Sequence, residues 1–240
     1  MTQDCEIESA SDNHYVAFCD ILGFASRVCN KFESTHDAYM ELANKWSQQE
    51  ISDSVSVSMF SDSIILSCPD LPPLISAIRM LWFHALFQDF MIRGAVVKGR
   101  HWEKSTGRNL FVVSEALIRA VKIEQMVGVP AVVIADDIEI EDELWGYFRF
   151  PTEGISSPIN AELLYFRDRV LINPFNTMWG VSAANRARQL MEASPNHKDK
   201  YLWFLALHEA VYNEELLMPP DVSARLLEKG SLIKMDSQPG

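Results

Sequence analysis

The sequence predicts an α+β fold in which a ferredoxin-like split βαβ sheet is followed by a C-terminal hairpin and a helical appendage. Short strand-like runs alternate with longer helical stretches in the order β-α-β-β-α-β, and then α-β. The 240 residues are 48% hydrophobic and 22% charged, which is typical of a globular protein with its own core.

The first half of this pattern is a strand, a helix and a hairpin. His14–Asp20 is a short apolar run with β-branched and aromatic members, which predicts a strand. A helical stretch follows from about Ala25 to Gln49. Val55–Phe60 alternates with period two and Ile64–Ser67 resumes after turn residues, which predicts a hairpin with Asp62 at its tip.

The second half repeats the alternation of helix and strand. A long amphipathic helix is expected after Pro72-Pro73, a strand over Ile92–Gly99, a helix over Val112–Met126 and a strand over Pro130–Ala135. Farther on, Leu163–Pro174 predicts a second hairpin that leads into two or three helices.

We therefore expect three segments. Residues 1–13 form a flexible N-terminal extension, residues 14–140 the main α+β unit, and residues 141–240 a hairpin and helices packed on the same core.

Composition excludes several classes of protein. A net charge of −12 argues against direct nucleic-acid binding, which needs a basic face. The polar, acidic N-terminus predicts no secretory signal. Charged and polar residues interrupt the longest apolar stretch, about Leu71–Met91, which predicts a buried helix and no membrane span. Four scattered cysteines fit reduced thiols, so we expect a cytoplasmic protein.

Basic residues are concentrated in one segment of this acidic chain. Ile92–Lys122 contains seven Lys and Arg residues against two acidic ones. Such a segment suits a small polyanion better than a nucleic-acid duplex, although a solvated loop rich in lysine and arginine is the alternative.

Two aspartates carry the candidate chemistry. Asp20 ends the first strand and Asp62 tips the hairpin, and these strands lie side by side in a split βαβ sheet. Paired carboxylates are ligands that Mg²⁺ or Mn²⁺ prefers. The turn Leu22-Gly23-Phe24 can offer backbone amides to phosphate oxygens. Alternatively, Asp20 caps a helix and Asp62 is a turn residue.

Three motifs resemble those of class III adenylate and guanylate cyclases. FCDILGF resembles their first metal motif and FSDSIILS their second, with Ser61 in place of a glycine. SEALIRAVKIE, residues 114–124, resembles a third block on a helix. The resemblance spans residues 14–138. It implies a palm-type catalytic domain, a nucleoside triphosphate substrate, and a homodimer whose active sites are shared between subunits.

The resemblance also implies the roles of individual residues. Two divalent cations, Mn²⁺ or Mg²⁺, would be bound by Asp20, Asp62 and the backbone carbonyl of Ile21. The family's transition-state asparagine falls on Ile118, and its arginine falls on Lys122, a catalytic candidate.

The base-reading residues of the family are replaced. The lysine and aspartate that read adenine fall on Ser58 and Phe111, neither of which can make those contacts. We also assign Phe60 and Arg93 to substrate binding, although Arg93 could instead be a surface arginine at a strand end.

This pattern, together with IRGAVVKG, resembles the bacterial antiphage pyrimidine cyclases called Pycsar. The resemblance implies synthesis of cyclic UMP or cyclic CMP, with UTP favoured over CTP, and an effector reached through the diffusible cyclic nucleotide. The alternatives are a purine cyclase, a cyclic-dinucleotide synthase, and a degenerate cyclase fold serving as a nucleotide-binding or dimerisation module. The hairpin lacks the Gly-Gly-acidic-acidic-Phe signature of the synthases.

Overall fold

The computed structural model describes residues 13–48, 53–107, 109–145, 161–176, 179–213 and 217–228. The expected N-terminal extension, residues 1–13, lies outside these ranges except for Asn13, which begins the first strand. Within the described ranges, no helix has both the length and the apolar character that crossing a bilayer requires.

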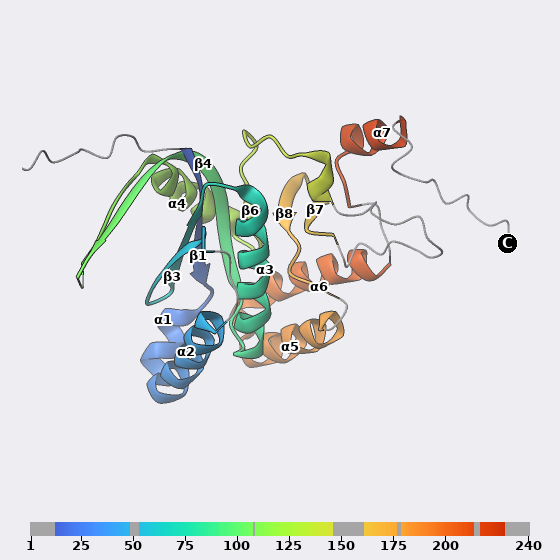
Figure 1. The fold of residues 1–240 in the computed structure, drawn as a ribbon. Helices are drawn as coiled ribbons and strands as arrows, with labels where there is room; N and C mark the ends of the chain where they lie inside the picture. Colours follow the sequence, from blue (N-terminus) through green and yellow to red (C-terminus); the bar gives the residue numbers. More distant parts are fainter. Residues whose placement is uncertain are drawn as a thin grey trace, which may run out of the picture.

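The elements follow one another along the chain as Figure 1 shows. The first part consists of β1 (Asn13–Ile21), α1 (Phe24–Asn30), α2 (Phe32–Ser47), β2 (Ser56–Phe60), β3 (Ser63–Cys68), α3 (Leu71–Phe87), β4 (Ile92–Thr106), β5 (Asn109–Ser114), α4 (Glu115–Val127) and β6 (Val132–Ile134). The second part consists of the short 3₁₀ helix η1 (Asp142–Trp145), β7 (Leu163–Phe166), β8 (Arg169–Ile172), α5 (Gly180–Ala193), the 3₁₀ turn η3 (Pro195–His197), α6 (Lys198–Tyr212) and α7 (Pro220–Glu228).

One sheet organises the molecule, with the strand order β2-β3-β1-β4-β6-β8-β7. β1 pairs antiparallel with both β3 and β4, so the first four strands have the split βαβ order. β6 then adds parallel to β4, and β8 adds antiparallel to β6. The α+β class and the split βαβ arrangement expected from the sequence are confirmed.

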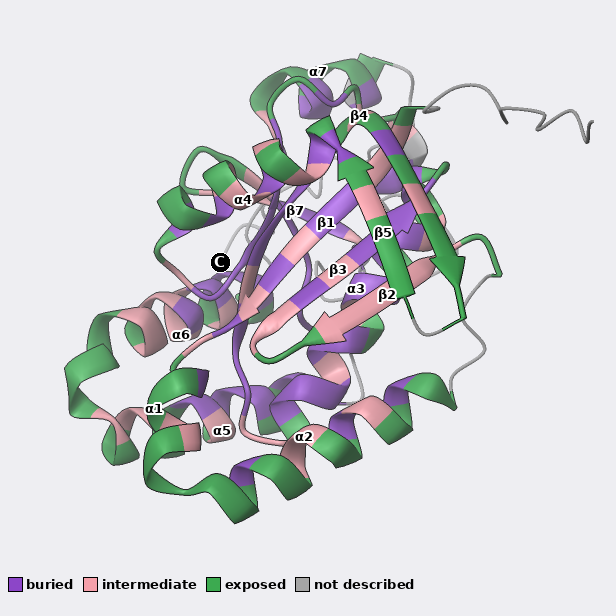
Figure 2. Ribbon diagram, turned by 90° about the vertical axis from the view of Figure 1, so that its left-hand side faces the viewer, coloured by how far each residue is buried: buried purple, intermediate pink, exposed green. Residues whose placement is uncertain are grey.

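Two expected elements differ in the structure. The single helix over residues 25–49 is two helices, because Lys31 leaves the helical region at φ −149° and ψ 57°. The expected strand Ile92–Gly99 continues to Thr106 and pairs with β5, which takes residues 112–114 from the expected helix. The second half of β4, from His101 to Thr106, pairs only with β5. This hairpin of residues 101–106 and 109–114, here called the arm, projects from the sheet and is largely exposed (Figures 1 and 2). Without a buried face, its sequence carries little hydrophobic periodicity.

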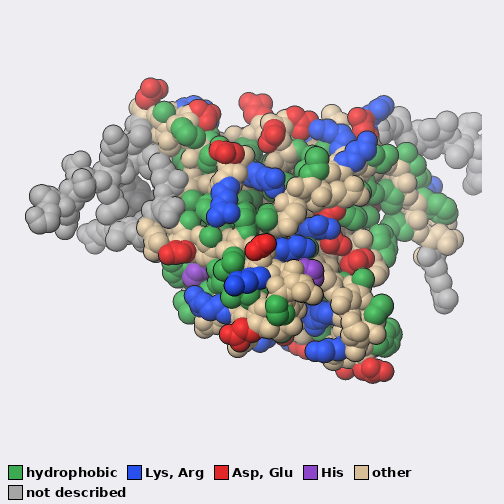
Figure 3. Space-filling model, turned by 180° about the vertical axis from the view of Figure 1, so that it is seen from behind, with side chains coloured by type: hydrophobic (Ala, Val, Ile, Leu, Met, Phe, Trp, Pro, Cys, Tyr) green, Lys and Arg blue, Asp and Glu red, His purple; other side chains and the backbone are tan. Residues whose placement is uncertain are grey.

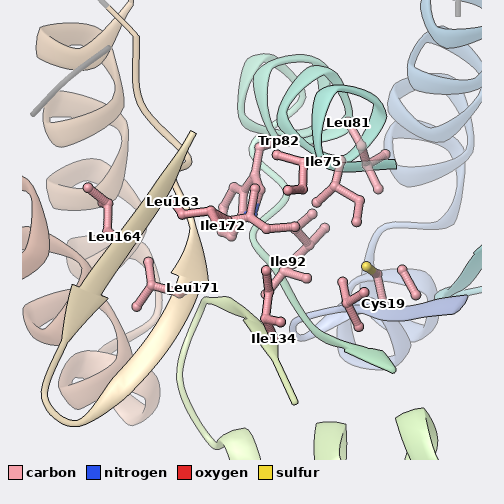
Figure 4. Packing of buried hydrophobic residues seen from close by; sticks show 14 of the residues in the cluster. Cys19, Ile75, Leu81, Trp82, Ile92, Ile134, Leu163, Leu164, Leu171 and Ile172 are labelled. Atoms are coloured by element: carbon pink, nitrogen blue, oxygen red, sulfur yellow. The ribbon is translucent and has the colours of Figure 1, made fainter. Parts of the chain in front are cut away.

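The two faces of the sheet have different roles. Cys19 and Ile92 point toward α3 and belong to the same buried cluster as Leu81 and Trp82 of that helix (Figure 4). Because side chains alternate along a strand, Asp20 and Arg93 point to the opposite face, which α4 covers next to β1 and β4. The α3 face is therefore apolar core, whereas the α4 face combines buried apolar side chains, such as Ala95, with the polar pair Asp20 and Arg93.

The C-terminal hairpin and helices share the same hydrophobic core. β7 and β8 turn at Arg167 and Asp168, which have left-handed φ values of 51° and 60°. The Phe204 ring of α6 stacks on Trp82 of α3 at a centroid distance of 5.7 Å and lies 5.1 Å from Phe175. These contacts tie α6 to the sheet at the end where β8 finishes.

The close approach of β1 and β4 gives a stability prediction. A Cβ on Gly94 would lie 2.6 Å from the Phe18 carbonyl oxygen and 2.8 Å from Cys19 Sγ, so Gly94→Ala must push the two strands apart. We expect it to lower the free energy of unfolding by about 2 kcal/mol, measured by denaturant titration. A Cβ on Gly99, on the same strand, would lie 3.4 Å from the Ala116 Cβ, which is ordinary contact. Gly99→Ala should therefore change the free energy of unfolding by less than about 1 kcal/mol. Equal effects of the two variants would contradict this reading of the β1–β4 contact.

Candidate active site

The ends of β1 and of the β2–β3 hairpin bring Asp20 and Asp62 together. Asp20 lies opposite Ser63 in the β1–β3 register, and the Ile21 N–H donates to the Asp62 carbonyl at 2.9 Å. Burial raises the pKa of the Asp20 carboxyl, and the negative charge of Asp62 adds to that rise. The two carboxylates therefore act on each other at one edge of the sheet.

The hairpin tip requires an unusual backbone conformation. Ser61 has φ 58°, in the left-handed region that costs a non-glycine residue about 1 kcal/mol or more. Glycine adopts this conformation without a steric penalty, which explains why the resembled motif has glycine there. Ser61 thus keeps the turn that presents Asp62.

Arg93 connects the sheet to α4 beneath this edge. Its Nε lies 3.2 Å from Asp20 Oδ2 and also forms an ion pair with Glu124, whose side chain is almost fully buried. Ser114 begins α4 as its N-cap, accepting from the Leu117 N–H at 2.9 Å. Glu124 lies on the buried stripe of this helix with Ala116, Ala120 and Val127. One guanidinium is therefore held between two carboxylates from two elements.

The cluster has more negative than positive charge. Burial raises the pKa of Glu124, Arg93 opposes that rise, and the charges of Asp20 and Asp62 add to it. Arg93 likewise opposes the effect of burial on Asp20. The cluster thus contains three carboxylates, Asp20, Asp62 and Glu124, and one guanidinium, Arg93, which pairs with two of them.

Hard oxygen donors next to unbalanced negative charge fit Mn²⁺ or Mg²⁺, and Asp20 and Asp62 are the residues that would hold it. Among the described residues, no group of three or more His, Cys, Asp or Glu side chains converges as a ready metal cluster. The remaining ligands would have to be main-chain carbonyl, water or substrate oxygens, which is how Mg²⁺ is usually bound at phosphate-transfer sites.

The turn after Asp20 is partly engaged in the fold. The Leu22 N–H donates to the Met91 carbonyl at 2.8 Å, so this amide is already used within the sheet edge. Gly23 has φ 75°, and Phe24 is buried where it begins α1. Of the three residues expected to hold phosphate, Gly23 is the N-cap of α1 and Phe24 its first residue, positions whose backbone amides have no partner within a helix.

The other predicted substrate residues are distributed over β2, the arm and α4, and Phe60 is the nearest to the carboxylates because it pairs with Ser63, the register partner of Asp20. Ser58 is half-buried on β2 and Phe60, at its end, is 50% exposed. Phe111 lies on the arm and is 53% exposed. Lys122 is exposed on α4, and within the described chain no hydrogen bond or ion pair joins it to Asp20. A single subunit thus brings together Asp20, Asp62 and Arg93 but neither Phe111 nor Lys122.

Sequence reasoning missed the role of Glu124. A signal was present, because an acidic residue at the i+4 position from Ala120 falls on an otherwise apolar stripe of a helix. An acidic residue there needs a buried cation, and Arg93 supplies it.

Charges of both signs are interspersed on the face seen from behind, where Lys and Arg side chains form no continuous stripe (Figure 3).

No family model and no curated protein matches the chain. Among solved structures, it is similar to the adenylyl cyclase CyaB from P. aeruginosa, at 14% identity over 52% of this chain and 77% of that one, with a TM-score of 0.42. It is also similar to the guanylyl cyclase Cya2, at 11% identity over 53% and 77% of the two chains, with a TM-score of 0.41. Adenylate cyclases from Trypanosoma brucei in their monomeric state match at 9% identity over 56% and 78%, with a TM-score of 0.38. These identities and TM-scores are too low to assign a function to the chain.

The Arg93 ion pairs give a pH-dependent stability prediction. Arg93→Met leaves Glu124 buried without a counter-charge, so the free energy of unfolding should fall by about 3 kcal/mol near neutral pH. Folding raises the pKa of the Glu124 carboxyl, so the folded state holds its proton more tightly than the unfolded state does. This difference stabilises the folded state at pH values below the ordinary pKa of glutamate, and the stabilisation is lost as pH rises through the folded-state pKa. Removing Arg93 raises this pKa further, so the deficit should widen as pH increases.

Arg100→Met is the matched control for denaturant titrations at several pH values. Arg100 also lies on β4 and pairs with an α4 carboxylate, Glu115, at 2.9 Å, but this pair is exposed. Loss of this exposed ion pair should lower the free energy of unfolding by less than about 1 kcal/mol. A deficit in Arg93→Met that is no larger than this, or that does not change with pH, would show that Arg93 is not a buried counter-charge.

Proposed function

We propose that the protein is a nucleotidyl cyclase that converts a nucleoside triphosphate to a 3′,5′-cyclic nucleotide and diphosphate. The observation that carries the proposal is the convergence of Asp20 and Asp62, each within its motif, at adjacent ends of β1 and the β2–β3 hairpin. We assign residues 14–140 to the catalytic unit and residues 141–240 to a hairpin and helices packed on it.

The reaction forms a bond between the 3′-oxygen and the α-phosphorus and breaks the bond to diphosphate. When bound, two divalent cations would activate the 3′-hydroxyl and neutralise the leaving group. Asp20, Asp62 and the Ile21 carbonyl hold them. Arg93 offsets the charge of Asp20 and is itself held by Glu124, so the carboxylates stay close to one another.

For the base, we propose a pyrimidine, with UTP favoured over CTP, and a role for the product as a diffusible signal in antiphage defence. The support is the identity of two positions. Ser58 offers only a hydroxyl and Phe111 only an aromatic ring, so neither provides the charged contacts that the resembled adenylate cyclases make with adenine. The preference for UTP over CTP rests on the resemblance alone.

We further propose that two subunits share each active site. Within one subunit, Phe111 on the arm and Lys122 on α4 are both exposed, and no hydrogen bond or ion pair among the described residues joins either side chain to Asp20 or Asp62. Ile118, at the position of the family's asparagine, is 60% exposed on the same helix as Lys122. A two-fold axis would bring this surface to the partner's carboxylates twice and so complete two equivalent sites.

The first test is turnover with a panel of substrates. The purified protein is incubated with each of the four ribonucleoside triphosphates and Mn²⁺, and products are identified by mass spectrometry. We expect a cyclic pyrimidine nucleotide in large excess over cyclic purine nucleotides. Asp20→Ala and Asp62→Ala should each abolish turnover, because the metal site loses a ligand.

Asp37→Ala, which removes an exposed carboxylate on α2, serves as the control and should retain full activity. Near-wild-type turnover by Asp20→Ala or Asp62→Ala would refute the metal assignment. Equal turnover of ATP and UTP would refute only the proposed base preference.

The second test is complementation between inactive subunits. Asp20→Ala mixed with Lys122→Ala should regain activity, because a heterodimer contains one intact site and one doubly altered site. In an equal mixture with complete exchange, half of the dimers are heterodimers with one intact site of two, so the expected activity approaches about a quarter of the wild-type value.

Asp20→Ala mixed with Asp62→Ala is the matched control and should remain inactive, since both residues belong to the same half of the site. With exchange verified by tagged subunits, failure of the first mixture would place Lys122 in the same subunit's site.

A further inference from the structure

A polar pocket lies at the end of the sheet opposite the candidate active site. Its walls come from the start of β1 and of β2, the end of β3, and the first residues of the arm. His14 lines it and precedes Asp20 on β1 by six residues, which separates the two sites by roughly 20 Å along the strand. The pocket has a volume of about 360 Å³, a size that suits a small molecule.

A hydrogen-bonded carboxylate forms one wall of this pocket. His101 is almost fully buried, and its Nε2 lies 3.2 Å from Oε2 of Glu103. Hydrogen bonds from His101 and from Ser56 keep the pKa of Glu103 below its ordinary value, against the effect of burial. Because an ionised carboxylate only accepts hydrogen bonds, the proton of this contact is on the imidazole Nε2.

The other nitrogen of the same imidazole lacks a partner. His101 Nδ1 is buried and has no hydrogen bond to any residue that the structure describes. With the proton on Nε2, Nδ1 of a neutral ring is an acceptor, and a buried acceptor requires a donor. Asp53 and Glu103 add carboxylate acceptors, and none of the described lining residues is lysine or arginine. The pocket therefore offers more acceptors than donors.

An excess of acceptors fits a cation that carries N–H groups. A metal ion fits less well, because no three His, Cys, Asp or Glu side chains within the described ranges are placed to hold one. Trp102, which also lines the pocket, is 38% exposed. Ammonium and guanidinium groups bind to the faces of such rings through cation–π attraction.

We propose that this pocket, here called the arm-base pocket, binds a small organic cation with ammonium or guanidinium groups. The N–H groups of the cation donate to the carboxylates of Glu103 and Asp53, and its hydrocarbon part lies against Trp102. Because the walls come from both the sheet and the arm, the bound cation joins the two. The inference does not depend on the proposed cyclase function, since the pocket contains neither Asp20 nor Asp62.

Agmatine, which carries one guanidinium and one ammonium group, is the probe, and its binding to the full chain is measured by calorimetry. We expect saturable binding at one site in each subunit. Glu103→Gln removes the charge but keeps an oxygen that can accept from His101, and it should weaken binding by about ten-fold or more. Tetramethylammonium is positively charged but has no N–H group, so it should bind at least about ten-fold more weakly than agmatine.

Glu33→Gln is the matched control because it removes the same charge from an exposed position in the first turn of α2. It should change agmatine binding by less than about two-fold. Asp20→Ala should likewise leave agmatine binding unchanged, which separates the arm-base pocket from the candidate active site. If Glu103→Gln is unstable, Asp53→Asn alters an exposed position of the same pocket and should also weaken binding.

Absence of agmatine binding to the wild type, or equal effects of the Glu33 and Glu103 variants, would overturn the inference. Loss of binding in Asp20→Ala would overturn it as well, because agmatine would then bind at the active-site carboxylates. Equally tight binding of tetramethylammonium would contradict recognition through N–H groups.

Discussion

The site depends on one guanidinium held between two carboxylates. Arg93 pairs with Asp20 on the neighbouring strand and with Glu124 on the helix above it. Glu124 is buried, and a buried carboxylate without a counter-charge would be costly enough to prevent α4 from packing at this position. The ion pairs thus fix the distance between helix and sheet, and with it the shape of the edge where Asp20 and Asp62 meet.

The same cluster has an excess of negative charge, which a bound cation would balance. Burial raises the pKa of Asp20 and of Glu124, the charge of Asp62 adds to both rises, and Arg93 opposes them. Under the proposed function, a divalent cation would supply the missing positive charge, and the substrate's triphosphate would complete its ligand shell.

The sequence was sufficient for features that follow from local patterns. The order of strands and helices, the hairpin tip at Asp62 and its proximity to Asp20 all follow from alternation, turn residues and the split βαβ rule. The length of β4 could not be predicted, because its second half has no buried face. The break at Lys31 has neither glycine nor proline to mark it. The Arg93–Glu124 pair depends on a contact between residues distant in sequence, which no local pattern encodes.

The arm formed by β4 and β5 has a consequence for stability within the fold. A two-stranded ribbon without a covering layer is only marginally stable in water. Its apolar side chains Leu110, Phe111 and Val113 are exposed, so little buried area holds the two strands together. Backbone amides of the arm should therefore exchange with solvent faster than those of β1 or β3. Any molecule that covers these side chains would slow that exchange, which makes amide exchange in the arm a direct reporter of its occupancy.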